Sequence, residues 1–521
     1  MIRLQRITRD DFVKRSFCSD FIAVWGIFIA VALLLSACQP MAGSLSAAGS
    51  VVDAAEAPAE PAVSLPQDNV AIPTPFPTRP IYQPGELVDY IAQSGDTLPV
   101  LAVRFNTTVN EILQANSFIP ASATTMPPGM PMKIPIYYIP FWGSPYKIIP
   151  DSLFINGPAQ VGFDTKTFVD SYPGWLKNYH SYVSDANRSG AEIVDLIALR
   201  YSISPRLLLA LLEYQAGALS QAEVPEEVQR YPLGSRLWEN DGLYLQLVWA
   251  VNQLNDGYYR FKKGRLTSLE HPDGRIERFD PWQNTATVSL MNYFNAIYDE
   301  LQYRLAVSSA GFAATYADLF GDPWQNETPH MEGSLLQPEF SLPMEPGSVW
   351  AYTGGPHTGW GHGEPFAALD FAPPTETQGC VDTDEWATAV ASGVVARTGE
   401  GEVVLDLDGD GDERTGWVVF YLHVSKEGRP AVGQALQPGD PVGHPSCEGG
   451  SSTGTHVHIA RKYNGEWVPA DGYGGILAFN MEGWVARDGK EVYLGTLIRG
   501  SQVVTACTCS NRASFIQTDR R

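Results

Sequence analysis

The chain has 521 residues, of which 44% are hydrophobic, and it carries a net charge of −23. This length is too great for one hydrophobic core and indicates two or three domains. The acidic balance argues against nucleic acid, whose phosphates attract basic surfaces, so no nucleic-acid partner is expected.

The N-terminus carries a targeting signal. Basic residues precede an apolar run from Phe21 to Leu35, which is shorter than the roughly 20 residues that span a bilayer. The run closes on Leu-Ser-Ala-Cys at Cys38, which resembles the lipobox of bacterial lipoproteins. The resemblance implies a lipoprotein signal peptide over residues 1–38 and a lipidated Cys38. The alternative is an uncleaved anchor helix with an incidental cysteine.

Both alternatives place the rest of the chain outside the cytoplasm and tether it to the cell membrane, in the cell envelope. Residues 39–85 are rich in Ala, Pro, Ser and Gly and lack a sustained hydrophobic period. This composition predicts a disordered linker.

Residues 86–137 have the pattern of a small βααβ domain. A short strand precedes the turn Ser94-Gly95-Asp96-Thr97-Leu98, and Asp96 or Thr97 is suited to cap a helix. The stretch "EILQAN" ends at Asn116, and a closing strand reaches Ile136. This order resembles a LysM domain, which implies binding of glycans that contain N-acetylglucosamine. The alternative is a small αβ spacer without a ligand.

Residues 150–325 are predicted to form a helical domain. Apolar residues follow helical spacing in four segments, 191–199, 205–214, 243–254 and 286–305. Ser204 and Pro205 suit the start of the second segment, which ends near Glu213. That helix distantly resembles the catalytic-glutamate helix of lysozyme-like transglycosylases, where a carboxyl group protonates the glycosidic oxygen. The alternatives are a solvated glutamate and a lysozyme-like scaffold that has lost its activity.

Residues 340–500 change character, because short β-rich runs alternate with Gly- and Pro-containing turns. His456 and His458 stand two apart on a predicted strand, so both side chains point to one face. His423 lies on another predicted strand, and Asp370 ends a third. Two histidines with one carboxylate are a common catalytic Zn²⁺ set, which leaves the fourth position open for water.

These segments resemble the LytM/lysostaphin-type peptidoglycan endopeptidases. The matching pieces are "ALDFAPP", "VVFYLHV", "VGQALQPGDPVG" and "GGSSTGTHVHI". The resemblance implies an antiparallel β domain with a zinc ion, held in part by Asp370 and His458. It also implies that His423 and His456 are the catalytic pair beside the substrate carbonyl.

The first metal ligand departs from the usual pattern of that family, which has His four positions before the metal Asp. Here that position is Phe366, and the candidates are His357 and His362. The motif "GGPH" resembles the beta-lytic branch of the family, which favours His357 as the ligand, with His362 as the alternative.

Three further features belong to the C-terminal part. Cys380 and Cys447 are candidates for a disulfide, because an exported chain is exposed to oxidising conditions. The aspartate-rich run 406–412 resembles a calcium loop, but its place between two predicted strands favours a solvated hairpin tip. Residues 501–521 are predicted to be a C-terminal tail.

The combined prediction is a multidomain α+β protein that acts as a zinc metalloendopeptidase on peptidoglycan. The C-terminal domain would contact the peptide part and the LysM domain the glycan. Two alternatives remain. One is a non-catalytic protein that binds the wall or activates another enzyme, and the other is a glycan-cleaving enzyme that uses Glu213.

Overall fold

The computed structural model describes residues 79–140, 142–325, 327–375, 377–508 and 511–519. The predicted signal peptide, Cys38 and most of the predicted linker 39–85 lie outside these described residues. Among the helices of the described residues, none combines the length and the apolar character that crossing a membrane requires.

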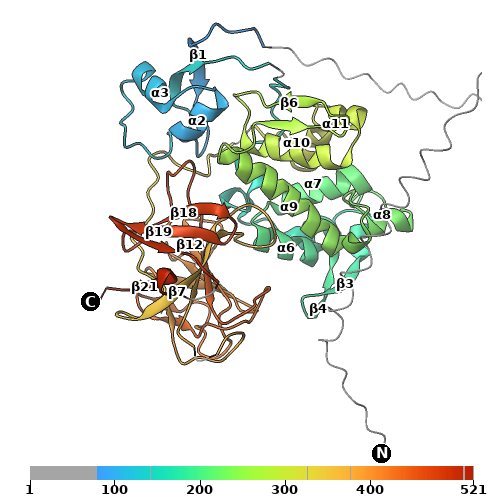
Figure 1. Cartoon of the computed structure of the whole chain (residues 1–521). Helices are drawn as coiled ribbons and strands as arrows, with labels where there is room; N and C mark the ends of the chain where they lie inside the picture. The colour runs from blue at the N-terminus through green and yellow to red at the C-terminus, as the bar shows by residue number, and fades with distance from the viewer. Residues whose placement is uncertain (1–78, 141, 326, 376, 509–510, 520–521) are drawn as a thin grey trace, which may run out of the picture. The chain divides into compact units, whose positions relative to one another are not determined.

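The first folded segment, blue in Figure 1, has the predicted βααβ order. Its strands β1 (Glu86–Ile91) and β2 (Pro131–Ile136) pair in antiparallel fashion, and between them lie α2 (Leu98–Arg104) and α3 (Val109–Ala115). Thr97 occupies the N-cap of α2, while Thr108 and Glu111 form a capping box at the start of α3. The two helices bury Leu101, Phe105 and Ile112 against the strands.

The middle domain contains nine α-helices within the described residues. As predicted, Ser204 caps the helix that begins at Pro205, and its side chain accepts a hydrogen bond from the Leu207 amide. The predicted helix 286–305 is instead two helices, because Asp299 interrupts it and caps the second. The helices are α4 (Asp151–Phe154), α5 (Thr165–Asp170), α6 (Gly190–Tyr201), α7 (Pro205–Ala216), α8 (Glu226–Arg230), α9 (Leu243–Lys262), α10 (Thr285–Ile297), α11 (Glu300–Ala306) and α12 (Phe312–Phe320).

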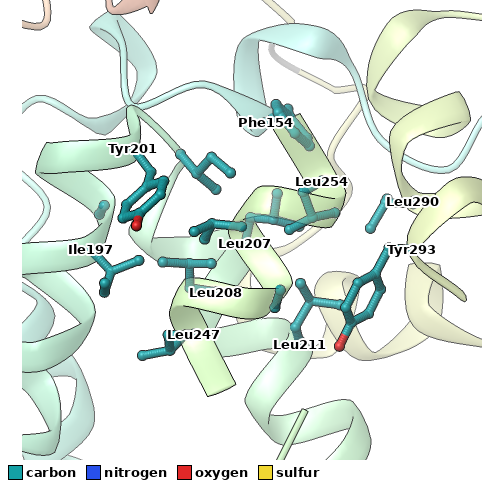
Figure 2. Close-up of a cluster of buried hydrophobic side chains, with 14 of the residues drawn as sticks. Phe154, Ile197, Tyr201, Leu207, Leu208, Leu211, Leu247, Leu254, Leu290 and Tyr293 are labelled. Carbon is teal, nitrogen blue, oxygen red and sulfur yellow. The ribbon is translucent and has the colours of Figure 1, made fainter. Parts of the chain in front are cut away.

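Helix α7 is the centre of the middle domain. Figure 2 shows Leu207, Leu208 and Leu211 of this helix among side chains from α6, α9 and α10. These three leucines have no exposed surface, and neither do Leu209 and Leu212. A helix that is apolar on all sides is buried in a core. Two short hairpins complete the domain: β3 (His180–Val183) with β4 (Ala186–Ser189), and β5 (Ser268–Glu270) with β6 (Ile276–Arg278).

The C-terminal domain is built on a nine-stranded antiparallel sheet. Its strand order is β13-β10-β11-β12-β15-β8-β7-β21, and β16 pairs with β15. The strands are β7 (Val349–His357), β8 (Ala368–Ala372), β10 (Gly393–Thr398), β11 (Val403–Asp406), β12 (Trp417–Leu422), β13 (Ala435–Leu436), β15 (Val457–Tyr463), β16 (Glu466–Trp467) and β21 (Phe515–Gln517). The antiparallel β structure predicted for this part of the chain is therefore present.

The end of the chain extends this domain, contrary to the predicted tail 501–521. Strand β21 pairs with β7 at the edge of the large sheet, with Ile516 opposite Trp350 and only 1% exposed. A second sheet contains β17 (Asn480–Met481), β18 (Trp484–Glu491), β19 (Leu494–Arg499) and β20 (Gln502–Thr505). The apolar residues of β20 and β21 lie in short segments whose pairing partners are distant in sequence, which is why local pattern did not reveal them.

A buried ionic cluster joins the middle domain to the C-terminal domain. Lys262 of α9 lies 2.6 Å from the Glu466 carboxylate of β16, and neither side chain is more than 3% exposed. The hydroxyls of Tyr258 and Tyr473 donate to the same carboxylate, and His330 Nε2 lies 2.6 Å from it. Burial opposes ionisation, but the charge of Lys262 and the His330 contact outweigh it and lower the pKa of Glu466 to about 2.

We expect Glu466→Gln to cost about 3–5 kcal/mol at pH 7, because it leaves Lys262 buried without a counter-charge. The pKa of Glu466 is 4.5 ordinarily and about 2 in the folded protein. Its stabilising contribution is therefore complete above pH 4.5 and is lost as the pH falls toward 2. Chemical denaturation should therefore show that the difference in free energy of unfolding between the variant and the wild type decreases as the pH falls from 4.5 to about 2.

The control for this substitution is Glu300→Gln, which removes an exposed partner of Arg304 on α11. Exposed ion pairs contribute little, so this variant should unfold almost as the wild type does. Equal destabilisation by both substitutions would contradict the role given to the buried cluster.

Candidate metal centre

Three adjacent strands bring His357, Asp370 and His458 together. Asp370 on β8 lies directly opposite His458 on β15, and His357 ends β7, the strand on the other side of β8. Each of the three side chains is nearly buried, with no residue more than 6% exposed. The antiparallel register therefore converts three segments that are far apart in sequence into one compact set of metal-ligand groups.

The geometry of this set fits a tetrahedral metal ion. His357 Nε2 lies 3.1 Å from His458 Nδ1 and 3.2 Å from Asp370 Oδ1, and His458 Nδ1 lies 3.4 Å from the same oxygen. Ligands about 2.0–2.1 Å from a tetrahedral zinc ion are separated by about 3.3–3.4 Å. Asp370 Oδ1 is buried without a hydrogen-bond partner, which a cation at this position would supply.

Backbone carbonyls set the tautomers of the two histidines. His357 Nδ1 lies 2.9 Å from the Gly355 carbonyl, and His458 Nε2 lies 3.2 Å from the Gly359 carbonyl. A carbonyl only accepts, so these nitrogens carry the ring protons. When the rings are neutral, the nitrogens that face Asp370 present lone pairs, which is the arrangement that a metal ligand requires.

The charge of the cluster also favours a cation. Burial by itself would raise the pKa of Asp370, but His357 and His456 outweigh this effect and hold the pKa well below its ordinary value. The Asp370 side chain is thus an anion that faces ring nitrogens. A carboxylate and two imidazoles form the donor set of many zinc sites.

His423 and His456 lie next to the metal-ligand set. Their ring centroids are 4.5 Å apart, and His456 Nε2 lies 3.7 Å from Asp370 Oδ1. His423 Nδ1 donates to the Glu448 carbonyl at 3.0 Å, and His456 Nδ1 donates to the Gly454 carbonyl at 2.7 Å. In the neutral form of each ring, the proton therefore lies on Nδ1 and Nε2 carries a lone pair. Burial and the neighbouring histidines lower the pKa of His423 to about 3, so this ring is a free acceptor at neutral pH.

The two remaining histidines of this domain lie outside the cluster. His362 is exposed, and its backbone amide donates to the Asn252 side chain of the middle domain. His444 packs on Trp386 at 3.7 Å between ring centroids, and its Nδ1 lies 2.9 Å from the Glu385 carbonyl. The structure therefore places His357, and not His362, beside Asp370.

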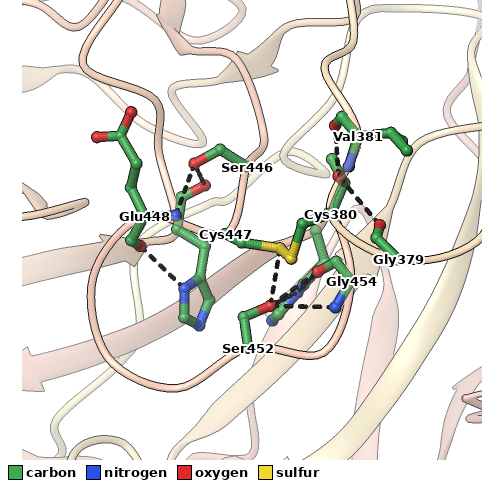
Figure 3. Close-up of a disulfide and its surroundings, with 11 residues drawn as sticks. Gly379, Cys380, Val381, Ser446, Cys447, Glu448, Ser452 and Gly454 are labelled. Atoms are coloured by element: carbon green, nitrogen blue, oxygen red, sulfur yellow. Dashed lines mark hydrogen bonds between the residues drawn. A yellow bond between two sulfur atoms is a disulfide. The ribbon is translucent and has the colours of Figure 1, made fainter. Parts of the chain in front are cut away.

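A disulfide anchors the loop that orients His423 and His456. Cys380 and Cys447 are bonded, and Figure 3 shows Glu448, Ser452 and Gly454 of the same loop around the bond. The carbonyls of Glu448 and Gly454 are the two acceptors that hold the His423 and His456 rings. One loop thus fixes both ring tautomers, and the disulfide ties that loop to the segment after β8.

We expect the double substitution Cys380→Ser/Cys447→Ser to lower stability by about 4 kcal/mol, because the bond closes a long loop. The cysteines are separated by 67 positions. The midpoint of chemical denaturation measures the loss under oxidising conditions. A midpoint within error of the wild type would show that the loop is held by its other contacts alone.

Tyr493 is part of this site, although the sequence analysis did not identify it. Its ring stacks on His357, with centroids 4.3 Å apart and planes 23° from parallel. The residue lies in the turn between β18 and β19, and its backbone pairs with Gly355 and Pro356. A tyrosine in a hairpin turn carries no local signal for such a contact, because the hairpin reaches β7 only through the fold.

Glu213 has a different environment from the one expected of a glycan-cleaving acid. One of its carboxylate oxygens accepts hydrogen bonds from the backbone amides of Leu219 and Ser220, at 2.8 and 3.1 Å. These bonds close the turn that follows α7. The observed partners are thus those of a residue that stabilises a helix end.

The aspartate-rich run forms the turn between β11 and β12, as the hairpin interpretation predicts. Oxygens of Asp406, Asp408 and Asp410 lie within 4.8 Å of one another. Backbone amides of the loop already bind these carboxylates. Asp406, for example, accepts from the amides of Asp408 and Gly411. Such bonds are typical of aspartate-rich turns.

Comparisons with known proteins agree with this domain order. Residues 90–135 match the LysM domain family, and residues 147–332 match the family described as LasA, N-terminal domain. The second match covers the middle domain, for which the sequence had suggested a lysozyme-like scaffold.

Protease LasA of Pseudomonas aeruginosa is 26% identical over 348 residues in strains UCBPP-PA14 and PAO1, covering 62% of this chain and 75% of that protein. Among solved structures, the M23 metalloprotease pseudoalterin from the deep sea is 26% identical. The match covers 33% of this chain and 96% of that chain, with a TM-score of 0.26. The catalytic domain of lysostaphin from Staphylococcus simulans is 22% identical, with coverages of 23% and 87% and a TM-score of 0.17.

Proposed function

We propose that this protein is a zinc-dependent endopeptidase of the cell envelope that hydrolyses peptide bonds in peptidoglycan. One observation carries the proposal: the buried Oδ1 atom of Asp370, without a hydrogen-bond partner, faces His357 Nε2 and His458 Nδ1. The similarity to protease LasA supports peptide-bond cleavage as the reaction.

His357, Asp370 and His458 would hold the ion, next to the proposed catalytic pair His423 and His456. Bound zinc lowers the pKa of a water ligand to about 7 and polarises a carbonyl group. In their neutral forms, with Nδ1 bound to backbone carbonyls, His423 and His456 could take up a proton at Nε2. They would accept a proton from the water that attacks the carbonyl and, once protonated, would donate it to the leaving amine.

The LysM domain supplies a second contact with the same polymer. We propose that it binds the glycan strands while the C-terminal domain acts on the attached peptides. Binding at one site raises the local concentration of substrate at the other. A lipid on Cys38 would hold both domains at the outer surface of the membrane, with residues 39–85 as a spacer.

Digestion of purified peptidoglycan tests the reaction class. The full chain with Zn²⁺ should release fragments with new peptide ends and without new reducing or anhydro sugar ends. A chelator should stop the release, and added Zn²⁺ should restore it. Glu213→Gln should digest as the wild type does.

Two other outcomes would replace the proposal with one of the alternatives. New sugar ends that disappear in Glu213→Gln would indicate a glycan-cleaving enzyme. Binding to peptidoglycan without any release, in protein shown to contain zinc, would indicate a non-catalytic wall-binding or activator protein.

A further inference from the structure

Residues 358–363, here named the bridging loop, connect the metal centre to the middle domain. The loop begins directly after His357, and its Gly359 carbonyl accepts the Nε2 proton of His458 at 3.2 Å. The loop is closed on itself, because Thr358 Oγ1 donates to the Gly363 carbonyl and the Gly359 amide donates to the Pro365 carbonyl. Its conformation therefore determines where the acceptor for His458 lies.

Helices α6 and α9 of the middle domain hold the far side of the bridging loop. Asn252 Oδ1 on α9 accepts a hydrogen bond from the His362 backbone amide at 3.2 Å. Gly361 has φ +84°, and a Cβ atom there would lie 2.4 Å from the Tyr201 ring of α6 and 2.9 Å from Asn252 Oδ1. Only glycine allows this approach, so the helices and the loop are in direct contact.

Trp360 provides the third contact between the loop and the middle domain. The Arg200 guanidinium of α6 lies 5.0 Å from the Trp360 ring, and the same ring meets Phe420 edge-on at 6.0 Å. Phe420 in turn packs edge-on against His458. Arg200 also lies 3.5 Å from Glu402, which is nearly buried in the C-terminal domain. Ring contacts from α6 therefore reinforce the hydrogen bond from α9 in holding the loop beside the His458 ring.

We propose that the middle domain is a positioning element for the metal centre, which acts through the bridging loop on His458. Asn252 and Gly361 are positioning residues, and neither touches the metal-ligand atoms. The inference rests on the proposed zinc site. It adds that the affinity of this site depends on a domain other than the one that supplies its ligands.

The expected effect on metal affinity depends on the hydrogen bond that the His458 ring makes through Nε2, on the side away from Asp370. The Gly359 carbonyl keeps the proton on Nε2 and fixes the ring plane, so Nδ1 stays aimed at Asp370. Loss of such an outer contact typically lowers metal affinity by about 10–100-fold. A bridging loop released from α9 would weaken this contact without removing any ligand.

Competition with a chromophoric chelator measures the Zn²⁺ dissociation constant of the full chain. We expect Asn252→Ala and Gly361→Ala each to raise it by about 10-fold or more. Asn252→Asp keeps an acceptor oxygen for the His362 amide and should restore most of the affinity. Asn292→Ala is the matched control, because this asparagine bonds the Gln253 carbonyl between α10 and α9 and does not contact the loop.

The outcomes separate this inference from the proposed function. A wild-type protein that does not bind Zn²⁺ would overturn both the proposed function and the positioning role. If Asn252→Ala and Gly361→Ala bind Zn²⁺ as tightly as the wild type does, the positioning role alone is overturned. An equal loss in Asn292→Ala would also overturn it, because the effect would then reflect the stability of the middle domain.

Discussion

Replacing His458 with alanine is expected to abolish tight Zn²⁺ binding and to lower peptide-bond hydrolysis by on the order of 10³-fold or more. A metal ion contributes several kcal/mol to stabilising the transition state, and each 1.36 kcal/mol is a factor of about ten in rate. The imidazole is 5% exposed and supplies one of three converging ligand atoms. Metal content and the rate of peptide release are measured on the same preparation.

His362→Ala is the control for this substitution, because His362 is exposed and contacts the middle domain only through its backbone amide. It should keep both Zn²⁺ and activity, since alanine retains that amide. His357→Ala should behave as His458→Ala does. Loss of zinc in His362→Ala with retention in His357→Ala would reverse the choice of first ligand.

Removing either member of the proposed catalytic pair, His423 or His456, should lower kcat by about 10²–10⁴-fold and leave Zn²⁺ bound. The Nδ1 atoms of His423 and His456 donate to backbone carbonyls, and neither residue belongs to the set that could hold a metal ion. Zinc content, kcat and KM of His423→Ala and His456→Ala test this division of roles. His444→Ala provides the control, because its ring packs on Trp386 outside the cluster.

The pH dependence gives a second test for His423. Its pKa is lowered to about 3, so the ring remains a proton acceptor at every pH above that value. If activity is lost on the acid side at a pH well above 3, the titration of another group must cause that loss. His423→Ala should then lower the rate at every pH without shifting the pH at which activity is lost. A limit that disappears in His423→Ala would show that this histidine titrates near neutrality.

Strand periodicity and the family resemblance together pointed to the residues of this cluster. The two-residue repeat predicted His456 and His458 on one face, and in the structure His458 lies on β15 while His456 directly precedes that strand. Asp370 lies on β8, but His423 follows the last residue of β12 with φ +63° and is not a strand residue, contrary to the prediction. His357 required the resemblance of "GGPH" to a known branch of a family, because its position relative to Asp370 depends on the loop between β7 and β8. The structure gives the short distance between His357 Nε2 and Asp370 Oδ1, which the local sequence pattern could not predict.

Other features depend on contacts between distant segments and were not predictable in this way. Tyr493 reaches His357 from a hairpin, and β21 joins the large sheet from a segment predicted to be a tail. Asn252 meets the bridging loop only because two domains pack together. In each case the local sequence is compatible with several partners, and the packing of the whole chain selects one.

The pairing of β8 with β15 would also link binding of the proposed zinc ion to correct folding. Asp370 faces His458 because these residues are direct partners in the antiparallel register. A slip of β15 by one position would turn His458 to the opposite face of the sheet. Zinc would then stabilise only the correctly registered sheet, by mass action on that state alone. The ion would act as a selective ligand for the native strand order while the chain folds, before any substrate is present.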